Sequence, residues 1–156
     1  MQALIKTALV AALSLSAFGA FAGEISDSTV YGAEAKNETG SAGAQAYQYI
    51  GSTYGSGKIT NNSHIWARGA HNGAFSINGV ASQEIGVAGK GGTMSNVTVF
   101  ADRAENGAKG SGATATQEIG KVTNGTMKNV TVWATDARNL AATDGSVAKQ
   151  KIGVVN

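Results

Sequence analysis

The sequence predicts an all-β fold, a repeat-built β-solenoid or cross-β stack with about four layers of 32–35 residues. Composition is the first reason. The chain of 156 residues contains 22 glycines and no proline, so every residue keeps the backbone amide donor that hydrogen-bonded strands require. The second reason is one sequence unit that recurs along the chain, as is typical of stacked repeats.

The repeat has two markers. Gln-x-Ile-Gly occurs at residues 48–51, 83–86, 117–120 and 150–153, so its glutamines are 35, 34 and 33 residues apart. Asn-Val-Thr-Val-aromatic-Ala occurs at 96–101 and 129–134, with a diverged copy at 62–67 and a trace at 30–32. From the last aliphatic residue of this marker to the next glutamine there are always 18 residues. This constant segment predicts a fixed structural unit, and the Gly-rich link between units behaves as a turn that accepts insertions.

Residues 1–22 have the features of an export signal. Lys6 is followed by a mostly apolar run to Phe18, and Ala20-Phe21-Ala22 supplies small residues where a signal peptidase reads. We expect cleavage before Gly23. A short membrane anchor is not favoured, because a span needs about 20 apolar residues. The predicted organisation is a signal peptide at 1–22 and one β-repeat domain at 23–156, with a half repeat at 23–47, repeats at 48–82, 83–116 and 117–149, and a half repeat at 150–156.

Alternating residues place amides on the buried face. Before Gln117, Ala113 and Ala115 alternate with threonines, so Gln117 shares a face with alanine and with Ile119. In a lone strand a buried amide without a partner costs about 1–3 kcal/mol. In-register stacking about 4.8 Å apart removes this cost, because each amide can bond the next. We therefore predict two ladders, Gln48, Gln83, Gln117 and Gln150, and Asn37, Asn72, Asn106 and Asn139. The alternative is that these amides are solvated surface residues.

An aromatic column accompanies the ladders. It consists of Tyr31, Trp66, Phe100 and Trp133, each beside an aliphatic residue that should face the opposite way. We interpret the rings as packing that supports the register. A carbohydrate-binding or lateral-contact stripe is the alternative.

Several classes of function find no support in the residues. The absence of cysteine excludes a disulfide framework, a thiolate metal site and a cysteine nucleophile. A net charge of +2 with 6% aromatic residues gives no case for a nucleic-acid partner. His64 and His71 do not recur between repeats and have no nucleophile arrangement around them. We therefore expect no enzyme activity, no catalytic residue, no metal and no cofactor, and no membrane insertion.

The two ends of the predicted domain complement each other. Asn156 followed by residues 23–32 matches the order of residues 124–134, with Ile25 in place of Met127. Gly23, Ile25 and Val30 of one copy should therefore meet Ile152 and Asn156 of another. A head-to-tail contact of this kind does not close and generates filaments. The alternative is a monomeric solenoid whose repeats begin in an arbitrary frame.

The repeats resemble the bacterial extracellular fibre subunits of the curlin and Fap type. The resemblance is carried by the Gly-, Asn-, Gln- and Ala-rich repeats, by Gln-x-x-Gly as in Gln83/Gly86, and by Asn-x-Ala as in Asn106/Ala108. It implies a subunit secreted to the outside or surface of a bacterium, which polymerises into amyloid-like fibres of a biofilm matrix or adhesive coat. It also implies export and nucleation accessory proteins as partners. A monomeric module that binds carbohydrate or ice is the alternative function.

Overall fold

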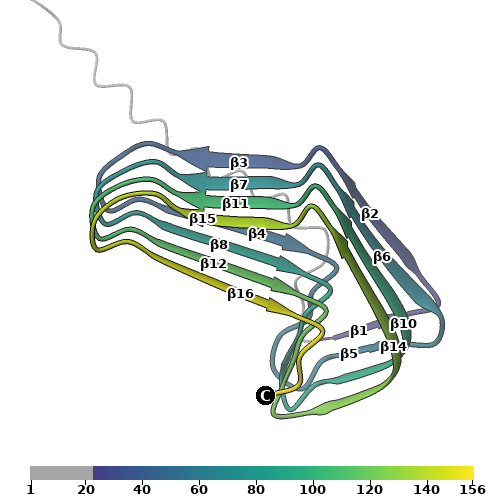
Figure 1. Cartoon of the computed structure of the whole chain (residues 1–156). Helices are drawn as coiled ribbons and strands as arrows, with labels where there is room; N and C mark the ends of the chain where they lie inside the picture. Colours follow the sequence, from purple (N-terminus) through teal and green to yellow (C-terminus); the bar gives the residue numbers. More distant parts are fainter. Residues whose placement is uncertain (1–22) are drawn as a thin grey trace, which may run out of the picture.

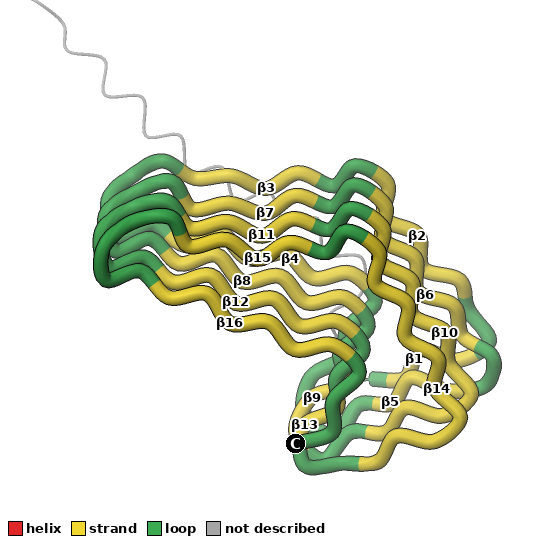
Figure 2. The backbone as a smooth tube through the Cα atoms, viewed as in Figure 1, coloured by secondary structure: helices red, strands yellow, loops and turns green. Residues whose placement is uncertain are grey.

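The computed structural model describes residues 23–156, and the expected export signal lies outside the described residues. This part of the chain forms strands and no helix. Successive turns stack in parallel as a β-solenoid (Figures 1 and 2). Glu24 pairs with Lys58, Lys58 with Thr93, and Thr93 with Thr126, so the turns begin one above another. The predicted all-β repeat fold is confirmed, with turn one at 23–57, turn two at 58–92, turn three at 93–125 and turn four at 126–156.

Each sheet collects equivalent strands from successive turns, and every pairing is parallel. The first sheet contains β1 (Glu24–Ser26), β2 (Thr29–Ala33), β5 (Lys58–Thr60), β6 (Ser63–Arg68), β10 (Thr93–Asp102) and β14 (Thr126–Thr135). The second contains β3 (Lys36–Thr39), β7 (His71–Ala74), β11 (Glu105–Ala108) and β15 (Arg138–Ala141). The third contains β4 (Gln45–Ile50), β8 (Val80–Ile85), β12 (Thr114–Ile119) and β16 (Val147–Ile152). The fourth is a short link of β9 (Ala88–Lys90) and β13 (Val122–Thr123).

The turns enclose two compartments of different width (Figure 2). In the arm, the second and third sheets face each other across alanines and amides, such as Ala108, Ala115 and Asn106. In the lobe, the first sheet and the link enclose aliphatic side chains, such as Ile65 and Val99. The residues that line each compartment set its width, because alanine and amide ladders allow two sheets to approach more closely than stacked isoleucine and valine do.

Period-two alternation decides which side chains enter the lobe. In β6, Ile65 and Ala67 are fully buried, whereas Trp66 and Arg68 between and after them are exposed. The same residue types recur in β10 and β14 in register. A one-residue slip of any turn would turn its buried residues to solvent, so the pattern fixes the register.

Corners between the sheets require backbone in the left-handed region. The glycine of the Gln-x-Ile-Gly marker is one such residue: Gly86 has φ of 59°, and a Cβ there would lie 2.7 Å from Val99 Cγ2. Asn96 and Asn129, with φ of 54° and 50°, make a similar corner within β10 and β14 of the first sheet. Asparagine tolerates this conformation better than other residues with a side chain. Both markers therefore contain a residue that makes a corner.

Candidate functional site: the amide ladders and the exposed edge of turn four

The predicted glutamine ladder forms inside the arm. Gln83 Nε2 donates to Gln48 Oε1 at 2.6 Å, and Gln117 Nε2 donates to Gln83 Oε1 at 2.7 Å. Gln150 continues the column by donating to Gln117. Gln48, Gln83 and Gln117 are buried, with side chains at most 1% exposed. In every pair the amide nitrogen points toward the earlier turn.

The predicted asparagine ladder also forms, but in the opposite direction. Asn37 Nδ2 donates to Asn72 Oδ1 at 2.9 Å, and Asn72 and Asn106 donate onward to Asn106 and Asn139 at 2.8 Å each. Its amide nitrogens thus point toward the later turn. The sequence predicted both columns, but it did not predict that their amides donate in opposite directions along the stack.

Each amide uses its second hydrogen to join the two sheets of the arm. Gln117 Nε2 also donates to the carbonyl of Ala104 at 3.1 Å, which precedes the second sheet. Asn106 Nδ2 donates in return to the carbonyl of Thr116, in the third sheet, at 3.0 Å. Both hydrogens of a buried amide are therefore satisfied, and the ladders hold the turns together along the stack and the sheets together across it.

The aromatic column lies on the outer face of the first sheet. Tyr31, Trp66, Phe100 and Trp133 are in register, and the ring centroids of Trp66 and Phe100 are 5.1 Å apart. The rings of Trp66 and Phe100 contact each other, and the column remains largely in solvent: Trp133 is 59% exposed. They therefore add contacts between turns from outside rather than filling the core.

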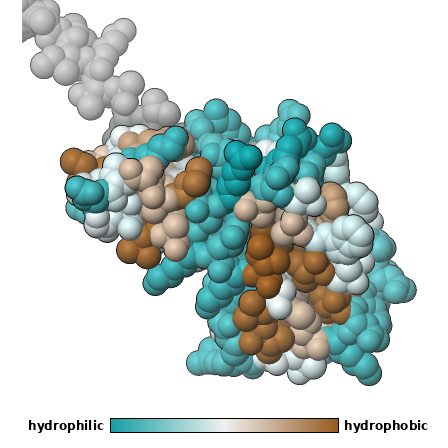
Figure 3. All heavy atoms as spheres, in the orientation of Figure 1, coloured by the Kyte–Doolittle hydropathy of each residue, from teal (hydrophilic) through white to brown (hydrophobic). Residues whose placement is uncertain are grey.

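The interior columns end uncovered at turn four. Ile119 in turn three is fully buried, whereas Ile152, its partner in register, is 40% exposed. Val155, the partner of the fully buried Val122, is exposed in the same way. Figure 3 shows a hydrophobic surface between β14 and the C-terminal segment, at this end of the stack. Among the described residues, none covers this edge.

The residues predicted to form a junction lie at opposite ends of the stack. Gly23, Ile25 and Val30 belong to turn one, and Ile152 and Asn156 belong to turn four (Figure 1). Ile25 pairs with Ile59 of turn two, and the backbone of Asn156 bonds to Val122 and Asn124 of turn three. One chain does not bring the two sets together, so a contact between them has to involve two copies.

The two ends carry opposite charge. Turn one contains four acidic residues and one basic residue, for a net charge of −3: Glu24, Asp27, Glu34 and Glu38 against Lys36. Turn four contains four basic and two acidic residues, for a net charge of +2: Lys128, Arg138, Lys149 and Lys151 against Asp136 and Asp144. Unlike charges therefore face each other when one copy follows another in the same direction.

Sequence reasoning missed a partly buried carboxylate pair on the outer face of the third sheet. Glu84 and Glu118 are neighbours in register, and Lys121 Nζ lies 2.7 Å from Glu118 Oε1. Burial, with a smaller contribution from Glu118, raises the pKa of Glu84 to about 7, and Lys121 opposes this shift. Glu84 and Glu118 occupy the same position of the repeat, so the sequence indicated that they are neighbours. Their burial could not be predicted, because it depends on how the link of β9 and β13 folds beside them.

The two histidines lie in different surroundings. His71 lies between two carboxylates, with Nε2 2.9 Å from Glu38 and Nδ1 3.5 Å from Glu105. His64 is exposed on the outer face of β6. Within residues 23–156 there is no group of three or more histidine and acidic side chains that could hold a metal ion. The same part of the chain contains no helix long and apolar enough to cross a membrane.

Fold and ladders together define a class: a parallel β-solenoid of four turns held by continuous glutamine and asparagine ladders. No family model, no curated protein and no solved structure matches the chain.

Proposed function

We propose that the protein is a secreted structural subunit that stacks head to tail into an extracellular fibre, with turn four of one copy against turn one of the next. The exposed edge of turn four carries this proposal. It presents the same columns that are buried in turns two and three, and it leaves Ile152 and Val155 in solvent. An uncovered strand edge with apolar side chains is a template for another strand.

Turn one supplies the matching layer. Val30, Tyr31, Asn37, Gln48 and Ile50 occupy the same columns as the corresponding residues of turns two to four. A second copy whose turn one stacks on turn four of the first therefore continues these columns.

The sense of the glutamine ladder selects the orientation of the contact. Gln150 donates toward Gln117, so its Oε1 acceptor is the group that remains for the next layer. In a head-to-tail stack, Gln48 of the next copy brings an amide donor to that acceptor. In a tail-to-tail pair, two acceptors would meet. The net charges of −3 and +2 on turns one and four favour the same orientation.

Features of the sequence support export of the protein and a place outside the cell. The features of residues 1–22 favour secretion, and the resemblance to curlin and Fap subunits favours a biofilm matrix or adhesive coat on a bacterium. Dedicated export and nucleation proteins are the expected partners besides the chain itself. The protein then acts through its assembled form, and no catalytic step is required.

Blocking one edge tests the proposal. Ile152→Lys places a charge in the apolar column of the exposed edge and leaves turns one to three unchanged. Purified residues 23–156, the part of the chain that the structure describes, should form filaments that pellet on centrifugation and are visible by electron microscopy. The Ile152→Lys protein should remain folded and monomeric. Thr114→Lys is the matched control, because it adds the same charge to the outer face of β12, away from both edges.

The blocked subunit should also act as a chain terminator. Its turn one is intact, so it can bind the growing turn-four end of a filament and stop further addition there. Substoichiometric Ile152→Lys protein should therefore slow elongation by the unmodified protein, and removal of residues 150–156 should impair elongation far more than folding. Unmodified protein that stays monomeric at high concentration, or Ile152→Lys protein that polymerises normally, contradicts the proposal.

A further inference from the structure

A second surface lies on the outer face of the first sheet, away from the stacking edges. It carries three neighbouring columns, which we call the outer stripe: rings (Tyr31, Trp66, Phe100, Trp133), hydroxyls with one imidazole (Thr29, His64, Thr98, Thr131) and amides (Asn62, Asn96, Asn129). Tyr31, Trp66 and Trp133 are 41–59% exposed. A large exposed apolar patch with polar residues at its rim is typical of interaction sites and ligand-binding grooves.

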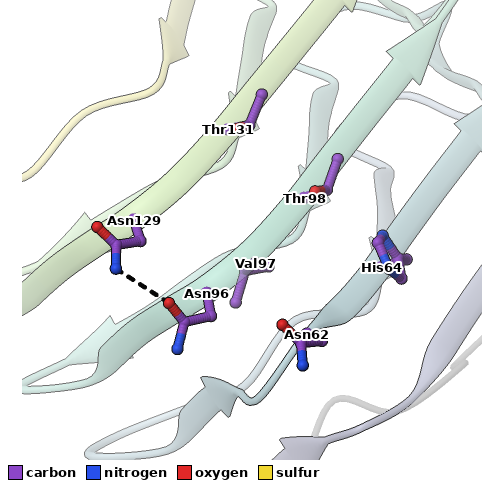
Figure 4. A pocket seen from close by; sticks show the side chains of 7 residues that line it. All are labelled: Asn62, His64, Asn96, Val97, Thr98, Asn129 and Thr131. Atoms are coloured by element: carbon purple, nitrogen blue, oxygen red, sulfur yellow. Dashed lines mark hydrogen bonds between the residues drawn. The ribbon is translucent and has the colours of Figure 1, made fainter.

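A hollow of about 390 Å³ lies beside the rings. It is lined by the amide column, by His64, Thr98 and Thr131 of the hydroxyl column, and by Val97 (Figure 4). Asn129 Nδ2 donates to Asn96 Oδ1 at 3.1 Å, and Figure 4 shows Thr98 and Thr131 as a second pair farther along the same strands. The left-handed backbone of Asn96 and Asn129 holds their amides at the rim of the hollow. The polar groups are therefore fixed in place beside the rings.

We propose that the outer stripe binds an extended, neutral polysaccharide chain that lies along the stacking axis. The C–H faces of sugar rings are apolar and stack on aromatic rings, while their hydroxyls bond amides and hydroxyls at the edge. The ring centroids of Trp66 and Phe100 are 5.1 Å apart, close to the advance per sugar of an extended β-1,4-linked chain. Successive sugars can thus meet successive turns. His64 is the one titratable group among the residues that line the hollow, which favours an uncharged ligand.

The same surface is a poor fit for a second copy of the chain. Arg68 and Asp102 border the rings on the side away from the hollow, and their side chains lie 3.7 Å apart. Face-to-face pairing of two outer stripes would press this charged pair against the same pair of the second copy. It would also bury two sets of threonine and asparagine side chains without assigned partners, which costs free energy. A narrow polysaccharide covers the rings and the hollow while the charged border stays in solvent.

Titration calorimetry with two soluble β-1,4-linked hexamers, cellohexaose and chitohexaose, tests the proposal. Maltohexaose, which is α-linked and coiled, is the negative probe. Both the unmodified protein and the Ile152→Lys protein should bind at least one β-linked hexamer and not maltohexaose. Using both forms separates this proposal from the proposed function, because binding by the edge-blocked chain does not depend on fibres.

Variants then locate the site. The double variant Trp66→Ala/Trp133→Ala should bind the hexamer at least about tenfold more weakly. Asn129→Gly, which suits the positive φ and removes only the amide, should weaken binding severalfold with the rings intact. Tyr47→Ala is the control, because Tyr47 is an equally exposed ring on the third sheet, and it should bind like the unmodified protein. Unfolding midpoints of all variants identify any loss of fold.

Three results would overturn the proposal. The first is the absence of binding of either β-linked hexamer by the unmodified protein. The second is unchanged affinity in a folded Trp66→Ala/Trp133→Ala variant. The third is a loss of lateral bundling of filaments in that variant without any glycan binding, which would assign the outer stripe to contacts between copies.

Discussion

Replacing Gln83 by leucine removes the centre of the glutamine ladder. Gln83 donates to Gln48 Oε1 at 2.6 Å and to the carbonyl of Ala70 at 3.1 Å, and it accepts from Gln117 Nε2 at 2.7 Å. Leucine has a similar volume and can make none of these bonds. The carbonyl of Ala70 keeps its bond from the backbone N–H of Glu105 at 2.8 Å. One buried acceptor, Gln48 Oε1, and one buried donor hydrogen, on Gln117 Nε2, are left without partners.

The expected loss of stability follows from this count. Each buried group left without a partner costs about 2 kcal/mol, so the two together cost about 4 kcal/mol. Burying the apolar leucine side chain offsets about 2 kcal/mol of this. Gln83→Leu should therefore lower the free energy of unfolding by about 2 kcal/mol, a substantial part of the total for a domain of this size.

Gln150→Leu is the matched comparison, because it makes the same change at the exposed edge. Gln150 donates to Gln117 and to the carbonyl of Ala137, but solvent reaches these groups when the side chain is changed. Its cost should be about 1 kcal/mol. Urea unfolding of dilute residues 23–156, followed by far-ultraviolet circular dichroism, measures both values. Equal and small losses for the two variants would refute the view that the ladder is a principal source of stability.

Three other expectations concern the corners, the carboxylate pair and the charged ends. Gly86→Ala should lower the free energy of unfolding by about 3 kcal/mol, because a left-handed φ and a Cβ 2.7 Å from Val99 Cγ2 act together. Gly43 is the control, because it has φ of 68° and no atom within 4 Å of an added Cβ. Gly43→Ala should lower the free energy of unfolding by about 1 kcal/mol in the same urea assay. The folded-state pKa of Glu84 is about 7, above its ordinary 4.5, so its contribution to stability is complete below pH 4.5 and is lost as the pH rises through 7. The loss should reach up to about 3 kcal/mol, and Glu84→Gln should flatten the pH profile of stability. Elongation, followed by light scattering, should slow at least severalfold between roughly 0.05 and 0.5 M NaCl, because salt screens the attraction between turns one and four. An elongation rate that does not depend on salt would contradict the view that opposite charges on these two turns promote assembly.

Much of the fold could be predicted from the sequence because one register satisfies every repeat. The constant segment from the aliphatic residue to the glutamine places Gln83 beside Gln117 and Trp66 beside Phe100 as soon as the turns stack. A one-residue slip between the turns would turn Ile65 or Val99 to solvent. The columns of the candidate site are therefore properties of the repeat, and the structure confirms the two ladders.

Other features depend on three-dimensional geometry that a repeat does not encode. The opposite senses of the two ladders depend on which backbone carbonyl each amide can reach, Ala104 for Gln117 and Thr116 for Asn106. The raised pKa of Glu84 depends on burial. The alternating pattern of the strand places Glu84 on the outer face and does not reveal this burial. The hollow beside the rings depends on the left-handed corner at Asn96, which the linear pattern of the marker does not show.

Disulfide formation between copies tests the central claim, head-to-tail stacking, most directly. Thr29 and Thr131 occupy one exposed column and are separated by three layers, or about 14 Å, within a chain. This distance is too long for a disulfide, whereas adjacent layers about 4.8 Å apart are within range. The chain has no other cysteine.

Oxidation of the double variant Thr29→Cys/Thr131→Cys under assembly conditions should give a series of dimers, trimers and longer covalent species on a denaturing gel. Either single variant should stay monomeric on the same gel. Absence of the series in the double variant, or disulfide-linked dimers from a single variant, would contradict the head-to-tail contact.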